Sequence, residues 1–265
     1  MGKQTGIAWC DSTFNPWWGC TRVSPACDNC YAEATAARWL KGGLWGAEIP
    51  RREMSTNYWR QPLNWEQNAL RDGRTQRVFC ASMADVFDKA APDGAREKLW
   101  ELIRATPHLD WLLLTKRVGN VASMLPADWG AGYHNVWLGI TVVTQAEIDR
   151  DVPKLLSLPA RVRWLSIEPL LEGVTLQHLT LSPDYDWRHQ KAGAGLLDWI
   201  VVGGESGPHA RVLLTSWVEQ LMEECLEADT AFFFKQGSQA NWPDFKNFDA
   251  FPKKLQVRQF PALLS

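Results

Sequence analysis

Three cysteines near the start of the chain have the spacing of a metal-binding motif. They lie in the stretch Cys20-Thr-Arg-Val-Ser-Pro-Ala-Cys27-Asp-Asn-Cys30, which reads C-x6-C-x2-C. Two intervening residues let Cys27 and Cys30 reach one metal centre, and Pro25 can turn the longer segment so that Cys20 reaches it too. In a reducing compartment, clustered cysteines indicate metal binding or catalysis before they indicate disulfides.

The number of thiolates indicates whether such a motif holds zinc or an iron–sulfur cluster. A structural zinc site closes four ligands, usually supplied by two paired motifs. The sequence contains neither a second C-x2-C nor a histidine pair at metal-binding spacing. Three thiolates instead suit a [4Fe–4S] cluster with one iron open to a substrate or cofactor. We therefore predict that Cys20, Cys27 and Cys30 hold a [4Fe–4S] cluster, with zinc as the alternative.

The rest of the chain has the composition of one globular protein. It has 265 residues, 46% of them hydrophobic, and a formal net charge of −2, so neither disorder nor a global electrostatic attraction to nucleic acid is expected. No run approaches the roughly 20 apolar residues that cross a bilayer, and the polar start does not resemble a secretory signal. We expect a cytoplasmic protein without a membrane partner.

The sixteen tryptophans are expected to pack in the core or at its rim. Cys10, Cys80 and Cys225 are expected to be core thiols.

Short apolar runs alternate with amphipathic stretches along most of the chain. The predicted strands are 6–10, 77–81, 110–116, 135–142, 161–167, 198–203 and 230–235. The predicted helices are 28–41, with Asp28 as N-cap, and 93–105, 118–125, 145–157 and 216–228. The strands are near-continuous apolar runs, which is typical of strands buried on both faces of a parallel sheet.

Repeated strand–helix units predict an α/β fold, specifically a (β/α) barrel, partial, with six to seven units. No G-x-G-x-x-G follows the first strand, which disfavours a doubly wound dinucleotide-binding sheet. We predict one domain over residues 1–265. It carries Trp-rich insertions near 43–76 and 175–197, and an irregular C-terminal tail at 237–265.

Polar residues follow the predicted strands where a barrel holds its active site, at the C-terminal strand ends. Ser82 and Asp85 are placed to bind ribose or substrate, and Thr141 ends the fourth strand. Lys116 and Arg117 can hold a carboxylate or phosphate.

Two glutamates also lie at predicted strand ends. Glu168 can accept hydrogen bonds from ribose or substrate, or can form an ion pair with Lys116 or Lys235. Gly203 and Gly204 allow close backbone approach ahead of Glu205, although a tight turn with a solvated glutamate has the same sequence.

Three cysteines after the first strand of a (β/α) barrel resemble the radical S-adenosylmethionine enzymes. The usual spacing in that family is C-x3-C-x2-C, so the first gap is longer here. The whole chain also resembles a poorly characterised phage and bacterial family with a three-cysteine motif. It shares the stretches TGIAWCDSTFNPWWGC, CDNCYAE, LLLTKR, SIEPLL and VVGGESG, and the likeness covers most of residues 5–240.

This resemblance implies an enzyme that reductively cleaves S-adenosylmethionine and starts radical chemistry. Together with the positions of polar residues at the predicted strand ends, it leads us to expect three groups of residues: metal ligands Cys20, Cys27 and Cys30; cofactor-binding residues Ser82, Asp85, Thr141, Glu168, Gly203, Gly204 and Glu205; and substrate-binding residues Lys116, Arg117 and Lys235. The implied partners are S-adenosylmethionine, an electron donor, a nucleic-acid base or nucleotide as substrate, and a co-encoded protein.

Two other functions stay open from the sequence. A zinc-stabilised nucleic-acid-binding or adaptor module without catalysis would use the same three thiolates. A barrel hydrolase with Glu168 and Glu205 as an acid–base pair would leave the cysteine motif unexplained.

Overall fold

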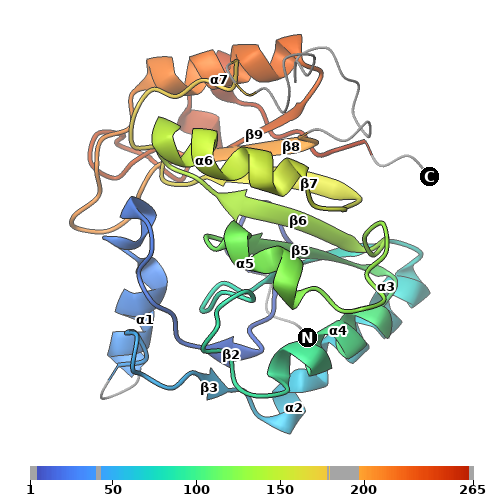
Figure 1. Ribbon diagram of the computed structural model, residues 1–265. Helices are drawn as coiled ribbons and strands as arrows, with labels where there is room; N and C mark the ends of the chain where they lie inside the picture. Colours follow the sequence, from blue (N-terminus) through green and yellow to red (C-terminus); the bar gives the residue numbers. More distant parts are fainter. Residues whose placement is uncertain (1–4, 40–42, 178, 180–196, 263–265) are drawn as a thin grey trace. The chain divides into compact units, whose positions relative to one another are not determined.

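The computed structural model describes residues 5–39, 43–177, 179 and 197–262 (Figure 1). Its internal contacts divide the chain into two compact units. The first comprises Met1–Ser24, Cys30–Leu138 and Pro159–Arg161, and the second comprises Pro25–Asn29, Gly139–Leu158 and Val162–Ser265.

The first unit contains the first parallel strands of the main sheet in chain order. They are β1 (Ser12–Thr13), β4 (Gln76–Cys80), β5 (Leu109–Thr115) and the start of β6 (Val136–Thr141). β1 pairs in parallel with β4, and β4 in parallel with β5. A separate antiparallel pair joins β2 (Trp17–Trp18) to β3 (Arg52–Glu53). The helices of this unit are α1 (Tyr31–Trp39), α2 (Thr56–Trp59), α3 (Gln61–Asp72), α4 (Ala95–Arg104) and α5 (Val118–Met124).

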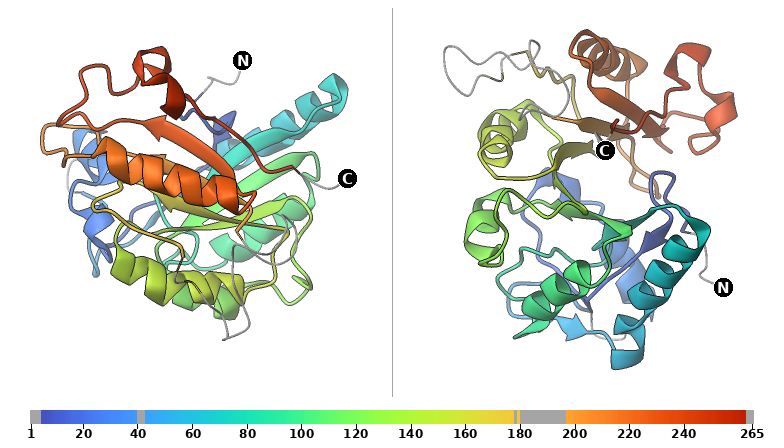
Figure 2. Two further views of the ribbon diagram at one scale, coloured as in Figure 1. Left: turned by 90° about the horizontal axis from the view of Figure 1, so that it is seen from above. Right: turned by 90° about the vertical axis from the view of Figure 1, so that its right-hand side faces the viewer.

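The second unit continues β6 and adds three further parallel strands. They are β7 (Val162–Ile167), β8 (Trp199–Gly203) and β9 (Ala231–Gln236), and the helices are α6 (Gln145–Leu156) and α7 (Thr215–Glu227). α7 lies along β9, and the described part of the C-terminal tail, in red, runs back beside that strand (Figure 2). The amide of Phe234 donates to the Val257 carbonyl (2.9 Å), so the tail pairs with the edge of β9. The described part of this tail contains two short 3-10 helices, Phe248–Ala250 and Lys253–Leu255.

Among the described residues the main sheet has seven strands in the order β1-β4-β5-β6-β7-β8-β9. Because this order follows the sequence, every crossover steps in the same direction, as in a (β/α) barrel, whereas a doubly wound sheet reverses. β1 and β9 are the edge strands, so the barrel is partial. The predicted fold class is therefore confirmed.

Aromatic packing fills the core of each unit, as the tryptophan content predicts. In the first unit Phe14 stacks on Tyr58, with ring centroids 5.2 Å apart, and meets Trp111 edge-on at 5.7 Å. In the second, the rings of Trp164 and Trp199 lie 5.2 Å apart. Gly139 makes room for this pair, because a Cβ there would lie 2.3 Å from the Trp164 indole.

Two boundary predictions are wrong. The first strand is Ser12–Thr13 and not 6–10, because the apolar run supplies buried residues such as Trp9 without pairing with a neighbouring strand. The first described helix, α1, begins at Tyr31 and not at Asp28, since Pro25–Cys27 forms a 3-10 turn and the Asp28 carboxylate pairs with Arg211.

Of the two predicted insertions, only segment 43–76 lies fully within the described residues. Segment 43–76 contains β3, α2 and α3, and α3 ends on Gly73 in the left-handed conformation that favours glycine. Most of segment 175–197 lies outside the described residues. Within the described residues, none of the helices is long and apolar enough to span a bilayer.

Candidate functional site

The backbone ahead of Cys20 is held tightly against its neighbours in the first unit. Gly19 has a φ of 116°, and a Cβ there would lie 2.7 Å from the Leu44 carbonyl oxygen. Its amide donates to the carbonyl of Met83 (3.0 Å), which lies three residues after β4. The positive φ and the close approach of Leu44 favour glycine at position 19. The hydrogen bond of its amide places Cys20 beside the C-terminal end of β4.

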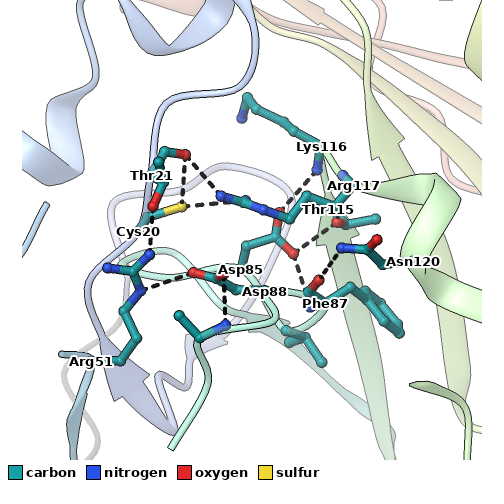
Figure 3. Close-up of polar contacts among 12 residues, drawn as sticks. Cys20, Thr21, Arg51, Asp85, Phe87, Asp88, Thr115, Lys116, Arg117 and Asn120 are labelled. Atoms are coloured by element: carbon teal, nitrogen blue, oxygen red, sulfur yellow. Dashed lines mark hydrogen bonds and ion pairs between the residues drawn. The ribbon is translucent and has the colours of Figure 1, made fainter. Parts of the chain in front are cut away.

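Arg117 connects Cys20 to a buried carboxylate (Figure 3). Its Nη1 lies 3.5 Å from the Cys20 sulfur and 2.9 Å from Asp85 Oδ2, and its Nη2 donates to the Thr21 carbonyl (2.8 Å). Arg117 follows β5 and Asp85 follows β4, so this network lies at the C-terminal ends of adjacent strands.

Asp85 has little accepting capacity left. Its carboxylate accepts hydrogen bonds from Thr115 Oγ1 (2.7 Å) and from the amides of Phe87 (2.9 Å) and Lys116 (3.1 Å), as well as from Arg117. A carboxylate offers about four lone-pair positions. The predicted contact of Asp85 with ribose would therefore have to replace one of these donors.

A second arginine, which the sequence analysis did not identify, holds the residue after Cys20. Arg51 has a fully buried side chain that pairs with Asp88 (2.9 Å) and donates to Thr21 Oγ1 (2.6 Å) and to the carbonyl of Gly46 (2.9 Å). Arg51 lies in the predicted insertion, and nothing in its local sequence distinguishes it from a surface arginine.

Burial and charge act in opposite directions on the Cys20 thiol. Burial raises the pKa of Cys20 above its ordinary value and Asp85 adds to this, whereas the Arg117 charge lowers it. Burial lowers the pKa of Arg117, but the charges of Asp85 and Cys20 outweigh that effect and raise it overall. Arg117 is therefore a permanent cation beside the sulfur.

The loop after β4, which contains Ser82 and Met83, contacts the segment that carries Cys30. Cys30 packs against a small apolar cluster that contains Met83. Tyr31 donates its hydroxyl hydrogen to the Ser82 carbonyl (3.0 Å), and Asn15 accepts from the Met83 amide (2.7 Å). The loop after β4 thus contacts the segments that carry both Cys20 and Cys30.

In the second unit, Glu205 forms an ion pair with Arg211 at the end of β8. Arg211 donates Nη2 to Glu205 Oε1 (2.5 Å), and its Nε (3.0 Å) and amide (2.8 Å) donate to Oε2. Asn29 donates to the same Oε2 (3.1 Å). Burial acts to raise the pKa of Glu205, but the hydrogen bonds from Arg211 and Asn29 outweigh it and hold the pKa below its usual range. Sequence reasoning missed Arg211 and Asn29.

Glu168 and the two glycines form a separate contact in this unit. Glu168 Oε1 lies 2.7 Å from Lys235 Nζ, which is one of the two ion pairs that the sequence allows. A Cβ on Gly203 would lie 2.9 Å from Glu168 Oε1, and one on Gly204 would lie 2.6 Å from the amide nitrogen of Ser238. The close approach that these glycines permit is therefore to the protein's own residues.

The predicted site residues are distributed over both units. The first unit contains Cys20, Cys30, Ser82, Asp85, Lys116 and Arg117; the second contains Cys27, Thr141, Glu168, Gly203, Gly204, Glu205 and Lys235. Thr141 is buried at the end of β6.

The donor chemistry of the cysteine motif fits an iron–sulfur centre. Cys20, Cys27 and Cys30 are free thiols, and soft thiolates select iron–sulfur clusters or zinc over hard cations. Neither unit alone contains, among its described residues, three His, Cys, Asp or Glu side chains arranged to hold a metal ion. Convergence of the three sulfurs therefore stays a prediction from their spacing.

A family model described as a protein of unknown function, DUF5131, matches residues 4–259. The chain belongs to this family. No curated protein and no solved structure gives a significant match. For this member of DUF5131, the function must therefore be inferred from the arrangement of its own residues.

Proposed function

We propose that this protein is a radical S-adenosylmethionine-type enzyme in which Cys20, Cys27 and Cys30 hold a [4Fe–4S] cluster. The observation that carries the proposal is that Met83, just after β4, contacts the segments of both Cys20 and Cys30. This puts two of the three predicted ligands at the C-terminal end of a barrel strand, where barrel enzymes hold their active sites.

A bound cluster of this kind would supply the single electron that splits S-adenosylmethionine and begins radical chemistry on a substrate. The protein's own residues would orient the ligands and keep water away. Arg117 donates to the Thr21 carbonyl and Arg51 to the Thr21 hydroxyl oxygen. Each arginine also forms a buried ion pair, with Asp85 and Asp88 respectively. Partners of this type orient metal ligands and tune the metal.

Cys30, the other predicted ligand of the first unit, is partly buried and packs on apolar side chains. Trp18, Trp45 and Cys30 pack on the cluster of buried residues formed by Ala32, Ala36 and Met83. Such a shell limits solvent access and thereby influences the potential of an iron–sulfur centre. A nucleic-acid base or nucleotide as substrate, an electron donor and a co-encoded protein partner stay predictions from the sequence resemblance.

Anaerobic purification and reconstitution test this proposal directly. We expect about four irons and four sulfides per chain, as a [4Fe–4S] cluster requires, and release of 5′-deoxyadenosine when S-adenosylmethionine and a reductant are added. Single alanine variants of Cys20, Cys27 and Cys30 should lose the iron. Cys80→Ala and Cys225→Ala are matched controls, because both thiols are fully buried in the core, and they should keep it.

Two results would contradict the proposal, each in a different way. Stoichiometric zinc without iron in protein purified without oxygen would favour the zinc-stabilised binding module. A loaded cluster that never yields 5′-deoxyadenosine would leave an iron–sulfur protein without the proposed reaction.

A further inference from the structure

We propose that Glu205 and Arg211 are positioning residues that hold the segment between Cys27 and Cys30. The proposal rests on the proposed function, because it gives those cysteines the role of metal ligands. It replaces the cofactor-binding role that the family resemblance implies for Glu205.

Arg211 directly contacts the segment around Cys27, although it lies 186 residues after Pro25 in the sequence. Its Nη2 donates to the Pro25 carbonyl (3.0 Å), and its Nη1 lies 3.3 Å from Asp28 Oδ2. These contacts fall on the two sides of Cys27. The same guanidinium also pairs with Glu205, which follows β8. One planar guanidinium with several donors therefore links the loop after β8 to the segment around Cys27.

Asn29 provides the second attachment, next to Cys30. Its side-chain amide donates to Glu205 Oε2 (3.1 Å) and to the carbonyl of His209 (2.8 Å). Both residues between Cys27 and Cys30 are therefore bound through their side chains to the loop that follows β8. A segment held at Pro25, Asp28 and Asn29 has few conformations left for the sulfurs that it carries.

The accepting capacity of Glu205 supports a structural role over cofactor binding. Its side chain is 6% exposed, one oxygen accepts from Arg211 Nη2, and the other accepts three hydrogen bonds. A cofactor ammonium group would have to displace one of these donors. The preceding Gly204 is explained by its packing against Ser238, without a ligand.

The test measures retention of the metal and binding of the cofactor separately. In reconstituted protein, Glu205→Gln and Arg211→Met should speed iron loss to a chelator 10- to 100-fold, the usual cost of removing a residue that orients a metal ligand. Affinity of the still-loaded fraction for S-adenosylmethionine should stay within about twofold of wild type. The double variant should be no worse than either single variant, because the two residues act as a unit.

Matched variants control for general damage. Arg150→Met breaks an ion pair elsewhere in the second unit, that with Asp151, and should leave iron loss unchanged. Arg211→Lys keeps the positive charge but not the planar set of guanidinium donors, and it should give an intermediate rate of iron loss. A Glu205→Gln protein that keeps its iron but binds S-adenosylmethionine much more weakly would overturn the proposal in favour of a cofactor ligand.

A measurement on metal-free protein distinguishes failure of this positioning role from failure of the proposed function. In metal-free protein, amide hydrogen exchange over residues 25–30 should be at least about tenfold faster in Arg211→Met than in wild type, because that segment opens locally. If wild type loads no iron but this difference is present, the proposed function fails and the positioning role stands. Equal exchange in the two proteins overturns the positioning role.

Discussion

The guanidinium of Arg117 joins the sulfur of Cys20 to the carboxylate of Asp85. Its Nη1 lies 3.5 Å from the sulfur and 2.9 Å from the nearer carboxylate oxygen. The Arg117 and Asp85 side chains are only 10% and 6% exposed, so the pair is nearly shielded from water. The charge beside this predicted metal ligand is therefore set by two buried residues that follow neighbouring strands.

Breaking this ion pair should destabilise the fold. Arg117→Met leaves Asp85 buried without its cation, and we expect the free energy of unfolding in urea to fall by about 3–5 kcal/mol. The double variant with Asp85→Asn should lose less than the sum of the single variants. Arg71→Met, which removes an exposed ion pair with Asp72, is the control and should change little. Strict additivity would show that Arg117 and Asp85 do not interact.

The same arginine should tune an iron–sulfur cluster bound at Cys20. A cation that donates to a ligand sulfur favours the reduced cluster, because reduction adds negative charge. In reconstituted Arg117→Met protein we expect the reduction potential to fall by about 60 mV, which is a tenfold change for one electron. A redox titration followed by electron paramagnetic resonance measures this. An unchanged potential would place Arg117 away from the cluster.

Two glycine substitutions should have opposite effects on stability. Gly139→Ala puts a Cβ 2.3 Å from the Trp164 indole, so overpacking should cost about 1–3 kcal/mol. Gly119→Ala is the matched control, because it lies on α5 with nothing within 4 Å of the new Cβ. It should stabilise the protein by about 0.4–1 kcal/mol through a less flexible unfolded chain. Denaturant unfolding measures both, and wild-type stability for Gly139→Ala would contradict the described packing of Trp164.

The ion pair of Glu205 and Arg211 should make stability depend on pH on the acidic side. The pKa of Glu205 is lowered in the folded protein, so its contribution is complete above the unfolded value, near 4.5, and is lost as pH falls through the folded value. Arg211 binds Glu205 directly, and Asp28 binds Arg211 in turn.

The melting temperatures of wild type and Glu205→Gln should therefore differ most near neutral pH. The difference should shrink as the pH is lowered below about 4.5. Thermal unfolding from pH 7 to pH 3 measures this. A difference that stayed constant or widened on acidification would show that the charge of Glu205 does not stabilise the fold.

The sequence by itself determined most strands of the sheet, whereas the metal chemistry of the cysteine motif stays a prediction from its spacing. Continuous apolar runs such as 110–116 and 198–203 predict strands buried on both faces, and the structure places β5 and β8 within one residue of each end of these runs. The two-residue β1 could not be predicted, because the apolar run before it indicates burial but not which residues pair.

Only the tertiary structure decided which side chains meet at the ends of those strands. Asn29 and Glu205 are 176 residues apart in sequence, and Arg117 and Cys20 are 97 apart. No local pattern identifies such partners, because a hydrogen bond between loops depends on the order in which the strands pair. The physical reason is that backbone preference and hydrophobic periodicity act over a few residues, whereas buried charges are matched only when the folded chain brings distant loops together.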